Sequence, residues 1–140
     1  MTTVDTLKLK ISEVEKYYQI VKKYQNISLQ DIEADDTVKG AVERYLYLLC
    51  QSSIDLGEAL ISYYKYRIPT TYADIFDILY ENNFISKQLA LSLARMSGFR
   101  NILAHSYGKV NFDIVYQVLT KDINVILEFV HLLKEKMKVV

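Results

Sequence analysis

The segment Arg100–Tyr107 combines three residue types that can act together on a phosphate group: Arg100, His105 and Tyr107. The guanidinium of an arginine is a permanent, planar positive charge that matches phosphate oxygens, and a histidine exchanges a proton near neutral pH. A tyrosine adds a phenolic hydroxyl that donates or accepts a hydrogen bond. This set predicts proton-transfer chemistry on a phosphate, with a purely structural role for the arginine as the alternative.

Arg100 lies on the apolar stripe of a predicted helix, between Met96 and Leu103. A buried guanidinium without a partner is strongly unfavourable, so we expect Arg100 to lie beside an acid, to open into a cleft or to face another subunit. Asp55 is a candidate ion-pair partner, since it stands among apolar residues in the middle of a long predicted helix. A solvent-facing Asp55 is the alternative.

The spacing of these residues restricts how one chain can use them. Successive residues of an α-helix are rotated by about 100°, so Arg100 and His105 point about 140° apart. Asn101 and His105 are four residues apart and share a face, which predicts that Asn101 orients His105 or a phosphate oxygen. Arg100 and Tyr107 share another face. Either the helix unwinds near Ala104 or a second copy of the chain completes the site.

Other chemistry-bearing residues give weaker indications. Cys50 is the single cysteine, so it forms no disulfide within the chain, and its apolar neighbours favour a buried side chain over a nucleophile. His131 has no metal-ligand spacing around it and is expected at the helix surface or at an interface. No glycine-rich phosphate loop or Ser-His-Asp order is present. We therefore predict neither a metal site nor a cofactor.

Composition restricts the class of protein. The chain has 140 residues, 51% of them hydrophobic and 24% charged, which is typical of one globular domain spanning residues 1–140. Its 17 basic and 17 acidic residues cancel, so any contact with nucleic acid must be local. Candidate positive positions are Lys65 with Arg67, and Arg95, Arg100 and Lys109. The sequence has no apolar run of about 20 residues and no signal peptide, which predicts a cytoplasmic protein.

The elements that position these residues are helices, because apolar residues recur at alternating spacings of three and four. The stripes are Leu7–Val21, Val38–Tyr63, Ile75–Tyr80, Leu89–Tyr107 and Tyr116–Met137. Predicted starts are Asp35 or Asp36, Thr70 or Thr71, Ser86, and Asn111 or Asp113, and Ser28 with Asp31 predicts one extra turn. Predicted ends are Pro69, Asn82 with Asn83, and Gly108. The sequence thus predicts an all-α, antiparallel four-helix bundle with an additional short helix.

Three segments of the chain resemble a known family. Gly98–Tyr107 is similar to the signature of the HepT-like toxins of the HEPN superfamily, in which an arginine and a polar residue precede a histidine and a tyrosine. Ala41–Leu46 leading to Ser53–Leu56 resembles the second helix of that family, and Pro69–Asp74 resembles its next turn. The resemblance covers essentially the whole chain.

This resemblance implies a helical bundle that forms a homodimer, with the two Arg-to-His segments across an interface cleft. Members are ribonucleases encoded beside a minimal nucleotidyltransferase antitoxin, which transfers AMP onto the motif tyrosine, here Tyr107. The implied activity is metal-independent cleavage of RNA by attack of the 2′-hydroxyl. His105 would shuttle the proton, Arg100 would stabilise phosphoryl charge with Asn101 in support, and Tyr107 would also position RNA.

A different class of function uses the same cleft without catalysis. The neutral overall charge is compatible with a helical module that binds a nucleotide or a partner protein, because a fold does not fix a function. Expression of the chain alone separates the two hypotheses, since a silent binding module is not expected to be lethal.

Overall fold

The computed structural model describes residues 2–106 and 109–138, and every regular element in these ranges is helical. The elements are α1 (Val4–Lys22), α2 (Leu29–Glu33), α3 (Asp36–Tyr64), α4 (Tyr72–Glu81), α5 (Lys87–His105), α6 (Phe112–Gln117), the π-helical segment η1 (Val118–Asp122) and α7 (Asn124–Met137). The prediction of an all-α protein is confirmed for the described residues. None of these helices is both long and apolar enough to cross a bilayer.

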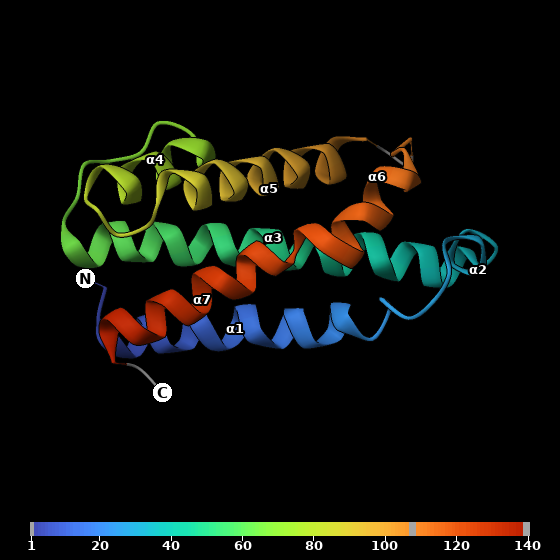
Figure 1. Ribbon diagram of the computed structural model, residues 1–140, viewed down its shortest axis with the longest axis horizontal. Helices are drawn as coiled ribbons and strands as arrows, with labels where there is room; N and C mark the ends of the chain where they lie inside the picture. The colour runs from blue at the N-terminus through green and yellow to red at the C-terminus, as the bar shows by residue number, and fades with distance from the viewer. Residues whose placement is uncertain (1, 107–108, 139–140) are drawn as a thin grey trace.

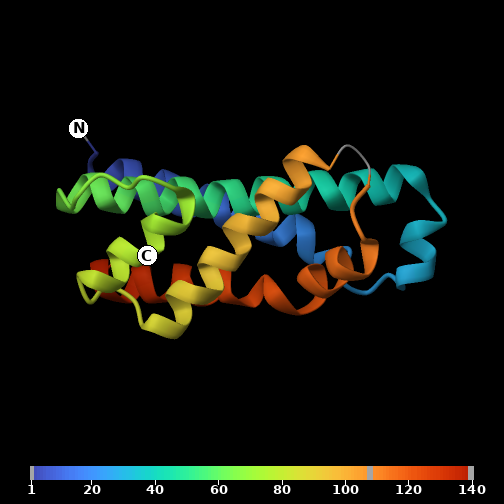
Figure 2. The same cartoon turned by 90° about the horizontal axis from the view of Figure 1, so that it is seen from above.

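The long helices α1, α3, α5 and α7 run alternately in opposite directions, as the predicted antiparallel bundle requires (Figure 1). The longest, α3, packs against α1 on one side and against α4 and α5 on another. Seen from above, α5 crosses obliquely over the bundle (Figure 2). The predicted additional short helix is α4, and α2 and α6 lie together at the end of the bundle far from the N-terminus.

The helices α1 to α6 begin where a side chain accepts a backbone N–H group. The capping residues are Thr3, Ser28, Asp35, Thr71, Ser86 and Asn111. The starts predicted at Ser28 and Ser86 are therefore confirmed, and Asp35, Thr71 and Asn111 are the members of their predicted pairs that form the cap. These short bonds fix where each helix enters the bundle.

The helix α3 ends at Tyr64, five residues before the predicted end at Pro69. Lys65 adopts the left-handed conformation with φ of 58°, and the Tyr66 N–H donates to the Ile61 carbonyl at 3.0 Å. This hydrogen-bonding pattern closes a helix as a glycine would at the same position. The prediction was wrong because nothing in the identity of a lysine announces a left-handed cap.

The predicted last helix is divided into α6, η1 and α7. Within η1 the Ile123 N–H donates to the Val118 carbonyl at 3.1 Å, which is the wide turn of a π-helix. The Thr120 hydroxyl donates to the Tyr116 carbonyl at 2.8 Å, a bond of the kind that bends helices. Val118 and Ile123 are both buried, so the wide turn keeps apolar residues against the core on each side of it.

One core joins the four long helices. The predicted stripe of α1 is buried along its whole length, at Leu7, Ile11, Val14, Tyr18 and Val21. Phe76 of α4 and Phe129 of α7 are fully buried and meet edge to face with ring centroids 6.1 Å apart. This core holds α3 and α5 in the fixed relation that builds the site described next.

Candidate active site

The helix α5 stays regular through the segment that carries Arg100 and His105. It extends to His105, and the Ser106 N–H continues the pattern by donating to the Ile102 carbonyl at 3.0 Å. The helix therefore does not unwind near Ala104, which removes the first of the two predicted alternatives. Arg100 is half-buried against α3, whereas His105 is exposed, so one chain alone does not bring the two side chains together.

Arg100 is held by three hydrogen bonds. Its Nε donates to Gln51 Oε1 at 2.6 Å, its Nη2 to the Tyr47 hydroxyl at 3.0 Å, and its Nη1 to Asn101 Oδ1 at 3.0 Å. The guanidinium also packs on aromatic rings, with its central carbon 5.0 Å from the centroid of Tyr47 and 5.4 Å from that of Tyr72. Cation–π contacts of this kind favour a charged arginine on a partly desolvated surface.

Asp55 is not the ion-pair partner of Arg100. Among the described residues neither Asp55 nor any other acid forms an ion pair with this arginine. Asp55 accepts a hydrogen bond from Gln51 Nε2 at 2.9 Å instead. Gln51 is bonded to both residues and therefore lies between the two charges. Tyr47, Gln51 and Asp55 follow one another at intervals of four on α3, so Gln51 stands one helical turn before Asp55 on the same face.

Sequence reasoning missed Gln51 and Tyr47. Both stand one or two turns before Asp55 on the same helix face, so helical spacing could have pointed to them, whereas Asp55 was chosen as an acid among apolar residues. Asn101 is exposed, and its partner is Arg100 rather than His105. The side chain of His105 is exposed and forms no hydrogen bond with a residue that the structure describes. Tyr107 and the predicted helix end at Gly108 lie outside the described residues.

A groove of about 360 Å³ runs beside Arg100 between α3 and α5. Its lining residues are Gly40, Glu43, Arg44 and Tyr47 of α3 with Leu103 and Ala104 of α5. Arg44 is exposed, and its guanidinium carbon lies 5.2 Å from the centroid of the Tyr47 ring. Two arginines thus pack on the same tyrosine, and one of them faces the groove.

A second, more apolar groove of about 560 Å³ lies between α5 and the segments α6, η1 and α7. Ile102 and Ile114 line it, and each is about half exposed, at 52% and 51%. On α5 the exposed residues Leu91, Arg95, Gly98 and Ile102 follow at intervals of three and four, so they form one outward face. His105 continues this face, three residues after Ile102. This outer face of α5 carries the exposed apolar side chains of Leu91 and Ile102 beside Arg95, and it lies away from Arg100.

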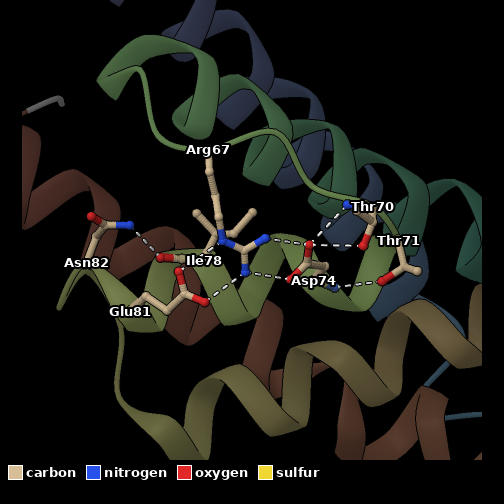
Figure 3. A network of polar contacts seen from close by, with 7 residues as sticks. All are labelled: Arg67, Thr70, Thr71, Asp74, Ile78, Glu81 and Asn82. Atoms are coloured by element: carbon tan, nitrogen blue, oxygen red, sulfur yellow. Dashed lines mark hydrogen bonds and ion pairs between the residues drawn. The ribbon is translucent and has the colours of Figure 1, made fainter.

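Arg67, a predicted positive position for nucleic acid, forms ion pairs with two acids of α4. Its guanidinium donates to Asp74 Oδ1 at 2.8 Å and to Glu81 Oε1 at 2.7 Å, and Asp74 also accepts from the Thr70 N–H (Figure 3). The hydrogen bonds from Arg67, and then that from Thr70, hold the pKa of Asp74 at about 2. The network fastens the linker after α3 to α4 and includes no residue of the groove beside Arg100 (Figure 3).

The remaining candidates do not add to the site. Cys50 is fully buried, and its burial raises the pKa of the thiol to about 12, which disfavours the reactive thiolate. His131 is exposed on α7. Within residues 2–106 and 109–138, no group of three or more His, Cys, Asp or Glu side chains is arranged to hold a metal ion.

These features define an all-α bundle with an Arg-to-His segment at the end of its third long helix. Residues 14–133 match the model of the family described as ribonuclease HepT-like. The chain therefore belongs to the ribonuclease HepT-like family, as the sequence motif predicted.

The relatives that match are themselves described as nucleases. The chain is 27% identical over 126 residues to the mRNA nuclease HepT of Shewanella oneidensis, covering 89% of this chain and 95% of that protein. It is 27% identical over 122 residues to the tRNA nuclease HepT of Aphanizomenon flos-aquae, covering 86% of this chain and 83% of that protein.

A solved structure extends the likeness to the fold. A tri-AMPylated HEPN toxin of Shewanella oneidensis, in complex with an MNT antitoxin, superposes with a TM-score of 0.85 and 26% identity. The match covers 95% of this chain and 99% of the toxin. The antiparallel bundle of the present chain is thus the bundle of a HEPN toxin.

Proposed function

We propose that this member of the ribonuclease HepT-like family is the endoribonuclease toxin of a toxin–antitoxin pair and cleaves RNA at a site shared by two copies of the chain, without a metal ion. The observation that carries the proposal is the regular course of α5 between Arg100, which faces α3, and the exposed His105. The names of the two nuclease relatives support RNA as the substrate.

The cleavage step uses groups that the RNA itself supplies. His105 takes the proton of a ribose 2′-hydroxyl, and the 2′-oxygen attacks the adjacent phosphorus. The bond to the 5′-oxygen of the next nucleotide breaks, a proton is returned to that oxygen, and the products are a 2′,3′-cyclic phosphate and a 5′-hydroxyl. Arg100 stabilises the negative charge that develops on the phosphoryl oxygens. Asn101, bonded to Arg100, supports this arginine rather than the histidine.

A homodimer completes the site. The outer face of α5, together with the apolar groove beside Ile102 and Ile114, is a surface that a second copy can cover. His105 continues this face, so dimerisation there brings the histidine of one protomer to the other chain. Because Arg100 lies on the opposite side of α5, we place the shared site at the end of this helix, where the two sides meet. RNA then follows the groove beside Arg44, where an exposed guanidinium can bind a phosphate or stack on a base.

The antitoxin is a minimal nucleotidyltransferase that transfers AMP to Tyr107. The AMPylated toxin of Shewanella oneidensis in complex with its MNT antitoxin supports this assignment, together with the position of the tyrosine two residues after His105. An added AMP brings bulk and a negatively charged phosphate to a site that binds phosphate, so it opposes RNA binding.

Mixing two inactive variants tests the shared site. Arg100→Ala and His105→Ala proteins are each expected to be inactive, and a chelator is expected to leave the wild type active. If Arg100 of one protomer acts with His105 of the other, a mixed dimer of the two variants contains one intact site, and cleavage of RNA returns on mixing. A mixture that stays inactive although mixed dimers form would contradict the shared site. A wild-type protein that binds RNA without cleaving it would favour the non-catalytic binding module.

A further inference from the structure

Arg100 is held by neutral groups, although an acid lies one helical turn beyond its partner. Gln51 accepts from Arg100 Nε at 2.6 Å and donates to Asp55 Oδ1 at 2.9 Å, so one side-chain amide connects the guanidinium to the carboxylate. All three residues are half-buried, which limits competition from water. Arg100, Gln51 and Asp55 therefore form a continuous series of hydrogen bonds at the contact of α3 with α5.

Asp55 determines which way the amide of Gln51 points. A carboxylate only accepts hydrogen bonds and a guanidinium only donates them. With Asp55 on one side and Arg100 on the other, the amide must direct its nitrogen to the acid and its oxygen to the arginine. A flipped amide would place like groups together at both ends. The carboxylate also polarises the amide, which strengthens its oxygen as an acceptor.

This arrangement leaves the charge of Arg100 available. A carboxylate in direct contact would form a bidentate pair with the guanidinium and neutralise it locally. The neutral amide of Gln51 accepts only from the Nε–H of Arg100. Tyr47 accepts one N–H from Nη2, and Asn101 accepts one N–H from Nη1. The residues that the structure describes thus use three of the five N–H donors of the guanidinium. One N–H on each terminal nitrogen remains for a ligand, which is the number that a bidentate contact with a phosphate requires.

We propose that Gln51 is a positioning residue of the ribonuclease site, oriented by Asp55, and that it fixes Arg100 for the transition state while keeping a carboxylate away from its charge. Tyr47 assists by accepting from Nη2 and by packing its ring against the guanidinium. The inference rests on the proposed ribonuclease function. It adds to that function the reason why a glutamine, and not an acid, faces this arginine.

The decisive variant is Gln51→Glu, which keeps the shape of the side chain and places a carboxylate on Arg100. Its kcat for a defined RNA oligonucleotide is expected to fall by roughly 100-fold, the scale of a mispositioned catalytic group, while the KM changes little. Gln51→Met, which removes the acceptor, is expected to lower kcat similarly. The matched control is Gln19→Glu, an exposed position on α1 with the same change of charge.

Asp55 provides a graded test. Asp55→Asn keeps an oxygen that can accept from Gln51 but removes the negative charge and adds a donor, so its kcat is expected to lie between those of the wild type and Asp55→Ala. Asp55→Ala leaves the amide free to flip and is expected to lower kcat. Circular dichroism and thermal unfolding of each variant show whether the bundle is intact, so a loss of activity with an unchanged melting temperature is positional.

A second readout does not depend on activity. In ¹⁵N NMR spectra the Nε–H of Arg100, identified by its loss in Arg100→Lys, is expected to exchange slowly in the wild type and rapidly in Gln51→Met. Equal kcat in wild type, Gln51→Glu and Gln51→Met would overturn the positioning role. If the wild type cleaves no RNA, the proposed function fails. If Gln51→Met also leaves the exchange rate of the Arg100 Nε–H unchanged, the claim that Gln51 fixes Arg100 fails as well.

Discussion

Arg44 and Arg100 pack on the same tyrosine ring, with guanidinium carbons 5.2 and 5.0 Å from the centroid of Tyr47. Arg44 comes from α3 and Arg100 from α5, so the tyrosine lies where the two helices present positive charge side by side. Arg100 is fixed by hydrogen bonds, whereas Arg44 is exposed at the groove. The two arginines are therefore suited to different tasks, one to the reacting phosphate and the other to a neighbouring nucleotide.

Replacement of Arg44 by alanine is expected to weaken the binding of RNA and to leave the chemical step intact. The KM for an oligonucleotide should rise and the dependence of binding on salt should become shallower, because one phosphate contact is lost, while kcat stays near the wild-type value. Steady-state kinetics at two salt concentrations measure both effects. Lys16→Ala on α1 is the matched control, since the exposed Lys16 also packs on a half-buried tyrosine, at 5.4 Å from the ring of Tyr17. Equal KM values for both variants would contradict the role of Arg44.

Introduction of an acid on the outer face of α5 is expected to separate the proposed dimer. In Ile102→Asp a charge replaces a half-exposed isoleucine of that face, and burial of an unpaired carboxylate opposes association. Light scattering should report a monomer, and RNA cleavage should be lost although the helical content is unchanged. Ile68→Asp, at a position that is 86% exposed, should remain dimeric and active. An active monomeric Ile102→Asp protein would exclude a site that needs two chains.

Gly57 and Gly40 of α3 are expected to respond in opposite ways to replacement by alanine. A Cβ on Gly57 would lie 2.6 Å from Ile75 Cγ2 of α4, so crowding should lower the free energy of unfolding by about 1–3 kcal/mol. A Cβ on Gly40 meets nothing within 4 Å, so alanine there should raise the free energy of unfolding by about 0.5–1 kcal/mol. Urea unfolding measures both values. A Gly57→Ala protein as stable as the wild type would mean that Ile75 moves aside without strain.

The Arg67 network is expected to make stability depend on pH in the acid range. The pKa of Asp74 in the folded protein is about 2, below its ordinary value of 3.8. The ionised carboxylate therefore contributes its full stabilisation above about pH 3.8, and this contribution is lost as the pH falls towards 2. The pKa of Glu81 is lowered by the same arginine and adds to the effect. The difference in unfolding free energy between wild type and Asp74→Asn should therefore shrink between about pH 4 and pH 2. A difference that stays constant over this range would contradict the assigned pKa.

The sequence predicted those parts of the fold that depend on one helix at a time. The stripe Leu7–Val21 and the caps at Ser28 and Ser86 follow from local rules, and the structure confirms each of them. The end of α3 at Lys65 depends on a left-handed lysine, which no local preference predicts. Local patterns therefore locate helices more reliably than they locate helix ends.

The site shows the same division between what one helix determines and what two helices determine. The regular spacing of Arg100 and His105 predicted correctly that one helix cannot bring them together. The choice of Asp55 as the partner of Arg100 was wrong, because opposite charge was taken as the criterion while the geometry between α3 and α5 selects the residue one turn earlier. A residue that connects two charges is recognised only when both helices are in place.

The wide turn of η1 has a consequence for how related chains should be aligned. A π turn accommodates one residue more than an α-helix of the same rise, so Val118–Asp122 has the geometry of a single-residue insertion that the helix absorbed as a bulge. A relative with one residue fewer at this point can keep Val115 and Ile126 in the core with an unbroken helix. A gap in this stretch of an alignment would therefore mark a straightened helix, not a missing turn.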